Sequence, residues 1–312
     1  MMPKPLSSRR GFLASAGLAS AAVLLSRVAA EAAVASGDLL HVSINQWSVG
    51  AVRGRDKQNA KIAFDDELAG LAAAGVNGLE PGLGSADQVE GLAAQLAKHK
   101  IELRSIYTGS SLTDPANVDK ERERIVALAK RAREVGTKIV VTNPSPNRQG
   151  KSDEQLKTQA AALNKLGHEL AGLGMKLAYH NHDVELQFAA REFHHMMVGT
   201  DPEAVSLCLD AHWVYRGAGH SQVALFDVLK LYGSRVSELH LRQSTGNVWS
   251  EAFGDGDIDY RELVRKLRAI SIRPLLVLEQ GPEGETPQTL EVAEVHRRSV
   301  RYVREIFADF AG

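Results

Sequence analysis

The sequence contains very little cysteine, which limits how the chain can be cross-linked. Cys208 is the single cysteine among 312 residues, so no disulfide can form within the chain. It stands inside the largely apolar run Val205–Leu209. We therefore expect Cys208 to be a small buried side chain rather than a catalytic thiol.

The sequence also lacks an excess of basic residues. Its 37 lysines and arginines are balanced by 38 aspartates and glutamates, which gives a formal net charge of −1. A protein that binds nucleic acid needs a concentrated positive surface to face the phosphates. The composition therefore excludes nucleic acid as an expected partner, and it disfavours an apurinic endonuclease.

Two further signals are missing, a nucleotide-binding loop and a linker. Gly254-Asp255-Gly256 lacks the third glycine of the dinucleotide fingerprint and the later acid that binds ribose. We interpret this segment as a turn over the active face. No stretch rich in proline, glycine or serine divides residues 39–310, so one domain accounts for this part of the chain.

The N-terminus carries an export pattern. Arg9 and Arg10 precede the apolar stretch Phe12–Leu25, and small residues follow over Ala29–Ala35. The apolar stretch is shorter than the ~20 residues of a membrane-spanning helix, so we expect no stable membrane anchor. The pattern resembles a bacterial twin-arginine signal peptide.

This resemblance implies a location and a partner. Residues 1–35 would be removed after export by the twin-arginine machinery, which carries folded proteins to the periplasm. Residues 36–312 would form the mature protein, with a net charge of −4 after the loss of four basic residues and one acid.

Eight short apolar runs alternate with eight helical segments in the remaining chain. The expected strands cover residues 39–47, 76–81, 102–108, 138–143, 176–182, 205–211, 236–242 and 274–280. The expected helices cover residues 64–74, 85–98, 118–135, 152–174, 191–198, 223–232, 260–270 and 288–310. Runs such as Lys138–Val141 and Leu275–Leu278 do not alternate, as parallel strands buried on both faces require.

A doubly wound open sheet would also alternate strands with helices. Two features favour a closed barrel instead: the number of pairs, and the polar residues that end nearly every strand. The expected fold is therefore of the α/β class, a single (β/α)8 TIM barrel. In such a barrel the carboxyl ends of all strands meet at one rim.

Four possible metal ligands, His180, Asp210, His240 and Glu279, each stand at the end of an expected strand. Convergence at one rim would let their nitrogen and oxygen atoms hold a divalent cation with positions open for substrate. A lone strand histidine is more often structural, and a buried carboxylate is often ion-paired. The arrival of all four from adjacent strands favours a metal site.

Five motifs resemble the xylose-isomerase-like TIM-barrel superfamily. They are Tyr179-His180-Asn181-His182-Asp183, Leu209-Asp210-Ala211-His212-Trp213, Glu238-Leu239-His240-Leu241-Arg242, Phe253-Gly254-Asp255-Gly256-Asp257-Ile258-Asp259 and Val277-Leu278-Glu279-Gln280. The resemblance implies a relative of sugar isomerases and epimerases, inosose dehydratases and 3-keto-glycoside lyases or hydratases. It also implies one divalent metal ion, which could be Mn, Zn, Co, Fe or Mg, on Asp210, His240 and Glu279.

The chain departs from the epimerase pattern at the fifth strand. Where the resemblance implies a glutamate that binds metal and moves a proton, this chain has His180. An epimerase needs a base on each face of the reacting carbon, and this substitution removes one of them. We therefore expect proton removal next to a carbonyl, followed by β-elimination or hydration of a 3-keto-glycoside. Isomerisation or epimerisation of a sugar through an enediolate is an alternative, and a non-catalytic periplasmic sugar-binding protein is another.

Further residues are candidates for catalysis and substrate binding. Candidate bases are Glu279, His182 and Glu80, and Arg242 is the candidate for holding an oxyanion. Glu80 could equally form a salt bridge at the rim. The expected contacts of the small carbohydrate substrate are Trp47, His212, Trp213 and Trp249, although tryptophans at a barrel mouth also serve as packing residues.

Overall fold

The computed structural model describes residues 40–55 and 62–311. The chain divides into two units, His41–Ala308 and a second unit made of Met1–Leu40 with Asp309–Gly312. The expected signal peptide, residues 1–35, lies outside the described residues. Within the described part, no helix combines the length and the apolar character needed to cross a membrane.

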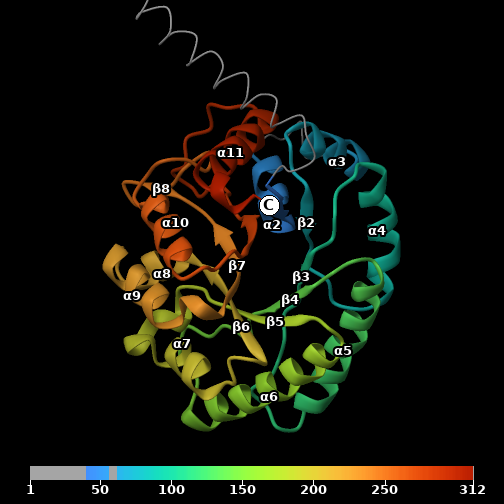
Figure 1. The fold of residues 1–312 in the computed structure, drawn as a ribbon, viewed down its shortest axis with the longest axis vertical. Coiled ribbons are helices and arrows are strands. Elements are labelled where there is room, and N and C mark those ends of the chain that lie inside the picture. Colours follow the sequence, from blue (N-terminus) through green and yellow to red (C-terminus); the bar gives the residue numbers. More distant parts are fainter. Residues whose placement is uncertain (1–39, 56–61, 312) are drawn as a thin grey trace, which may run out of the picture. The chain divides into compact units, whose positions relative to one another are not determined.

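The unit His41–Ala308 is built on eight parallel strands (Figure 1). They are β1 (Val42–Asn45), β2 (Gly78–Glu80), β3 (Ser105–Tyr107), β4 (Ile139–Thr142), β5 (Lys176–His180), β6 (Val205–Asp210), β7 (Val236–Leu241) and β10 (Leu275–Leu278). The strand order is β2-β1-β10-β7-β6-β5-β4-β3, and parallel bridges Gly78–Glu102 and Gly82–Tyr107 join its two ends. The strands therefore close into the predicted TIM barrel.

Helices surround the strands (Figure 1). They are α2 (Gln46–Arg53), α3 (Phe64–Ala73), α4 (Asp87–Lys98), α5 (Val118–Glu134), α6 (Asp153–Gly172), α7 (Gln187–Gly199), α8 (Ala211–Gly217), α9 (Gln222–Tyr232), α10 (Tyr260–Ala269) and α11 (Val292–Ile306). Short 3-10 turns η2 (Val184–Leu186), η3 (Gly233–Arg235) and η4 (Ala308–Phe310) and a two-stranded hairpin, β8 (Ser244–Thr245) with β9 (Val248–Trp249), complete the described elements.

Local signals fix the element that leads into the site. Ser152 caps α6, and its side chain and that of Gln155 form a reciprocal capping box. Gly174, with a φ of +71°, adopts the left-handed conformation that glycine tolerates best. This turn ends the helix and starts β5, which carries His180.

The strands are buried on both faces, as their apolar sequences predict. Ile139, Val141, Ala178 and Cys208, on the neighbouring strands β4, β5 and β6, form a buried apolar cluster. Cys208 has no exposed surface, which confirms its predicted burial. Polar side chains concentrate at the carboxyl ends of the same strands.

The structure differs from the predicted elements in several places, and one of them is helix α8, which was not predicted. The first strand ends at Asn45, whose side chain caps α2, so Trp47 lies in a helix rather than in a strand. The β8–β9 hairpin was not predicted because its strands have only two residues each. Phe188, Ala189 and Ala190 adopt left-handed backbone angles ahead of the regular part of α7, a conformation that side-chain patterns do not reveal.

Candidate active site

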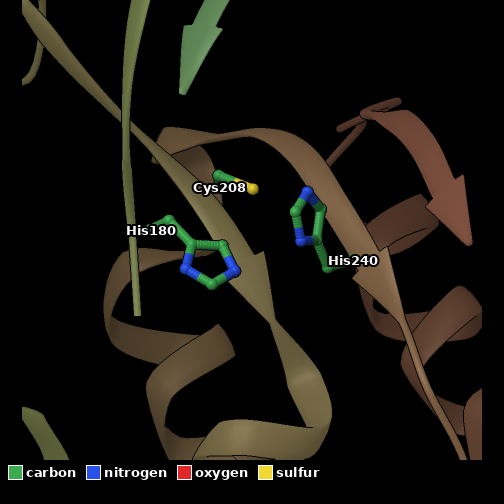
Figure 2. A group of neighbouring side chains, drawn as sticks. All are labelled: His180, Cys208 and His240. Atoms are coloured by element: carbon green, nitrogen blue, oxygen red, sulfur yellow. The ribbon is translucent and has the colours of Figure 1, made fainter. Parts of the chain in front are cut away.

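Strand register brings the four predicted metal ligands together. His180 and Asp210 are the last residues of β5 and β6, His240 lies on β7, and Glu279 follows β10 directly. Asp210 pairs with His240 across the β6–β7 ladder. Ligand atoms of all four residues lie within 4.8 Å of one another. Figure 2 shows the rings of His180 and His240 facing each other, with Cys208 beside them.

Distances within this cluster suit a shared ligand. Nε2 of His180 lies 4.0 Å from Oδ2 of Asp210 and 3.9 Å from Oε2 of Glu279. Nδ1 of His240 lies 2.7 Å from the same Glu279 oxygen. Among the described residues, Oδ2 of Asp210 and both ring nitrogens of His180 lack a hydrogen-bond partner although they are buried. Buried polar atoms are rarely left unpaired outside functional sites.

Negative charge is crowded around the cluster. Asp210, Glu279, Glu80 and Glu238 are all buried around His240, and Glu279 also pairs with the permanent cation Arg242. Burial and the charge of Glu80 raise the pKa of Glu238 to about 8. Burial, together with Glu279, raises the pKa of Asp210 to about 6 against the opposing effect of Arg242. A nearby divalent cation would favour the ionised carboxylates.

Glu279 differs from these acids. Burial disfavours its charge, but Arg242 and His240 outweigh that effect and hold the pKa of Glu279 well below its usual range. Its carboxylate is therefore ionised at neutral pH and able to act as a ligand.

The donor set fits a divalent cation. Ligand atoms bound at about 2.1 Å from one ion are separated by roughly 3–4 Å. The three pairs of ligand atoms described above are 2.7, 3.9 and 4.0 Å apart, so small side-chain shifts would accommodate an ion. Two imidazoles and two carboxylates suit Zn, Mn, Fe or Co, whereas Ca and Mg prefer oxygen ligands throughout. His180, Asp210, His240 and Glu279 are the residues that would hold such an ion.

A cavity of about 530 Å³ opens beside the cluster, within the usual range for ligand pockets. Its lining comprises Asn45, Gln46, Trp47, Gly82, Tyr107, His182, Trp213, Arg242 and Glu279. Predicted ligand, catalytic and substrate-binding residues therefore meet in one space.

Arg242 joins the cation cluster to the tryptophans. Its Nε donates to the Glu279 carbonyl oxygen at 2.8 Å, and its Nη2 lies 3.1 Å from the Glu279 carboxylate. Its guanidinium carbon lies 4.3 Å from the ring centre of Trp249 and 4.8 Å from that of Trp213. Among the described residues, Nη1 has no hydrogen-bond partner. The stacked rings thus hold the guanidinium with one donor group available.

His182 is held in a neutral form at the cavity wall. Burial and the neighbouring His180 lower the pKa of His182 to about 3. Its backbone N–H donates to Glu185 at 2.6 Å, which fixes the residue after the end of β5. A neutral imidazole has a lone pair that can accept a proton, although a pKa of about 3 makes His182 a weak base.

Six predicted residues lie outside the cavity lining: the buried ligands His180, Asp210 and His240, and also Glu80, His212 and Trp249. Glu80 has no exposed surface, and its Oε2 lies 3.2 Å from Nε2 of His240, on the side away from Glu279. This position does not suit a base that must reach substrate. His212 is fully buried with its ring centre 6.1 Å from that of Trp249, and the Trp249 ring packs against the Arg242 guanidinium. Direct substrate contact by His212 and Trp249, expected from the sequence, is not supported by these positions.

Sequence reasoning missed Tyr107 and Glu238 as parts of the site. The ring of Tyr107 lies edge-on to His180, with 5.5 Å between ring centres, and it lines the cavity. Burial raises the pKa of Tyr107 above its usual value, so the hydroxyl stays protonated. The position of Tyr107 near the end of a predicted strand could have identified it as a site residue. The sequence signal for Glu238 was weaker, because it was only an acid within a largely apolar strand.

Comparison with known proteins identifies the same architecture. A family model described as xylose isomerase-like TIM barrel matches residues 68–305. An inosose dehydratase from Clostridium botulinum (strain Alaska E43 / Type E3) is 26% identical over 270 residues, covering 76% of this chain and 89% of the relative.

Solved structures share the fold at lower identity. A sugar phosphate isomerase/epimerase from Parabacteroides distasonis superimposes with a TM-score of 0.69 at 19% identity, covering 89% of this chain and 97% of the other. The 3-keto-D-glucoside 4-epimerase of E. coli gives a TM-score of 0.62 at 15% identity, with coverage of 85% and 99%.

Proposed function

The chain belongs to the xylose isomerase-like TIM-barrel family, and from this premise we propose that it is a divalent-cation-dependent enzyme of carbohydrate metabolism. The proposed reaction removes a proton next to the carbonyl of a keto-sugar or sugar derivative. The observation that carries the proposal is the convergence of His180, Asp210, His240 and Glu279 within 4.8 Å, with Glu279 lining a substrate-sized cavity.

We infer that elimination is the preferred outcome. Four residues would bind the cation, and the fifth-strand ligand is the imidazole of His180 rather than a carboxylate able to return a proton. A dehydratase removes water from its substrate, so the inosose dehydratase relative supports this choice. The best-suited substrate is a 3-keto-glycoside, because its ketone acidifies the C2–H bond beside the C1 leaving group.

The chain supplies groups for each proton movement. When bound, a divalent cation would polarise the ketone oxygen and a neighbouring hydroxyl of the substrate, which acidifies the C–H bond between them. His182 takes that proton on its neutral imidazole. Arg242 donates from Nη1 to the oxygen on which negative charge develops.

Completion of the reaction requires a proton for the departing group. As the C1–O bond breaks, the protonated hydroxyl of Tyr107 donates to the leaving oxygen, and an unsaturated keto-sugar remains. Trp47 and Trp213 flank the cavity and offer apolar faces to the sugar ring. Addition of water to the double bond would complete a hydration.

Epimerisation is the second candidate, and the E. coli 3-keto-D-glucoside epimerase supports it through its fold. In that case, after His182 removes the proton, a second group on the opposite face would supply a proton to the same carbon, with no bond to a leaving group broken.

Cation binding provides the test. We expect the purified protein to bind about one Zn²⁺ or Mn²⁺ per chain, and H240A to weaken binding and turnover at least tenfold by removing a ligand. H168A, which removes a largely exposed imidazole on α6, is the matched control and should retain both properties. Full turnover of keto-sugars by a cation-free preparation would contradict the proposal.

A further inference from the structure

His240 is the one member of the cation cluster with buried acids at both ring nitrogens among the described residues. Nδ1 lies 2.7 Å from Oε2 of Glu279, which belongs to the cation cluster. On the other side of the ring, Nε2 lies 3.1 Å from Oε1 of Glu238 and 3.2 Å from Oε2 of Glu80. The ring therefore separates two carboxylate groups with different surroundings.

Glu80 and Glu238 are held inside the barrel by the strands. Glu238 precedes His240 by two residues on β7, so both side chains project from the same face of that strand. Glu80 ends β2, and its Oε2 accepts a hydrogen bond of 2.6 Å from Asn45. Sγ of Cys208 lies 3.7 Å from Oε1 of Glu238. Both glutamates have no exposed surface, and neither lines the cavity.

The chemistry of imidazole gives this arrangement a consequence. A neutral histidine that binds a cation through one nitrogen carries its proton on the other nitrogen, and that N–H needs an acceptor. At Nδ1 the nearest acid is Glu279, a proposed ligand that would turn to the cation, so the acceptors that remain stand at Nε2. The nitrogen left for the cation is Nδ1, which faces Glu279.

We propose that Glu80 and Glu238 are positioning residues that accept the Nε2–H of His240 and so hold Nδ1 toward the cation. This inference rests on the proposed function, because it presupposes a cation on His240. Neither glutamate contacts substrate, so both act only through the imidazole. Loss of either acceptor loosens the ring and makes Nδ1 a weaker ligand.

The tautomer of His240 can be measured in the protein with Glu80 and Glu238 unchanged. We expect ¹⁵N NMR of the Zn²⁺-loaded, histidine-labelled protein to give an Nε2–H signal and a metal-bound Nδ1 for His240, assigned by its absence in H240A. A proton on Nδ1 with Zn²⁺ on Nε2 would overturn the proposal.

Substitutions measure the effect on cation affinity. We expect E80Q and E238Q, in which a neutral and weaker amide oxygen replaces each carboxylate acceptor, each to weaken Zn²⁺ binding by about 10–100-fold in competition with a chromophoric chelator. E192Q is the control, because Glu192 is also buried and pairs with Lys151 at 2.5 Å on α7, away from His240. E192Q should keep the wild-type Zn²⁺ affinity even if it lowers the melting temperature.

The outcomes separate this inference from the proposed function. Wild-type Zn²⁺ affinity in folded E80Q and E238Q would refute the positioning role alone. Failure of the wild-type protein to bind Zn²⁺, Mn²⁺ or Co²⁺ would refute the cation-dependent function, and this inference with it. If a glutamine variant does not fold, the NMR assignment on the wild-type chain still decides the matter.

Discussion

Glu185 is a buried acid beside the proposed base. Its Oε2 accepts the backbone N–H of His182, and burial raises its pKa to about 7. The folded protein therefore keeps a proton on Glu185 over a pH range in which the unfolded chain, with a pKa near 4.5, has lost it. The stability contributed by this proton is fully present below about pH 4.5 and is lost as pH rises through about 7.

This difference predicts a pH-dependent effect of E185Q. Glutamine stays neutral and can still accept the His182 N–H, so E185Q should be more stable than the wild type at pH 8, by up to about 3 kcal/mol. At pH 4.5 the gain should vanish. Urea unfolding of both proteins at the two pH values checks this, and an equal effect at both would show that folding does not raise the pKa of Glu185.

Single residues also show what the sequence could and could not predict. His180, Asp210, His240 and Glu279 were predictable because each follows an apolar run, and strand ends meet at one rim of a barrel. The two carboxylates that face Nε2 of His240 were not predictable as its partners, because Glu80 contacts His240 from another strand. Pattern within one strand does not reveal contacts made across the barrel interior.

At the scale of elements, close packing of α6 against the chain before β6 is essential to the barrel. A Cβ atom on Gly167 would lie 2.3 Å from the carbonyl oxygen of Ala204. Real Cβ atoms do not approach backbone so closely, so the helix would have to move away from β6. Gly91 in α4 offers a contrast, because an added Cβ there meets no atom of the described chain within 4 Å.

Replacing each of these two glycines with alanine should change the stability of the protein in opposite directions. We expect G167A to destabilise the protein by about 1–3 kcal/mol through overpacking. G91A should stabilise it by about 0.5–1 kcal/mol, because alanine favours the helix over glycine. Chemical denaturation measures both, and a stabilising G167A would mean that α6 and the Ala204 segment are not in contact as described.

Elements that depend on tertiary contacts were the least predictable. The strand positions followed from apolar runs, and their ends shifted by a few residues. Trp47 entered a helix because Asn45 caps it, although the apolar pattern extended the strand through this position. The left-handed turn Phe188–Ala190 contains no glycine, so the sequence has no signal for it. Backbone conformations of this kind are set by the surrounding structure.

At the scale of the whole molecule, we propose that the chain is exported to the periplasm. Arg9 and Arg10 followed by an apolar stretch support this proposal. If the arginines are read by a receptor, the R9K/R10K variant should leave the precursor in the cytoplasm although its charge is unchanged. Fractionation followed by immunoblotting measures this. Unchanged periplasmic accumulation would indicate another export route or signal.

The central claim is cation-dependent removal of a proton next to a ketone, with loss of the β-substituent. Proton NMR of the cation-loaded enzyme with 3-keto-glycosides in D₂O tests it most directly, because it follows the C2–H signal and the free aglycone together. We expect the C2–H signal to disappear as aglycone is released, and prior removal of the cation to stop both. Deuterium incorporation with the aglycone fully retained, or equal turnover without the cation, would contradict it.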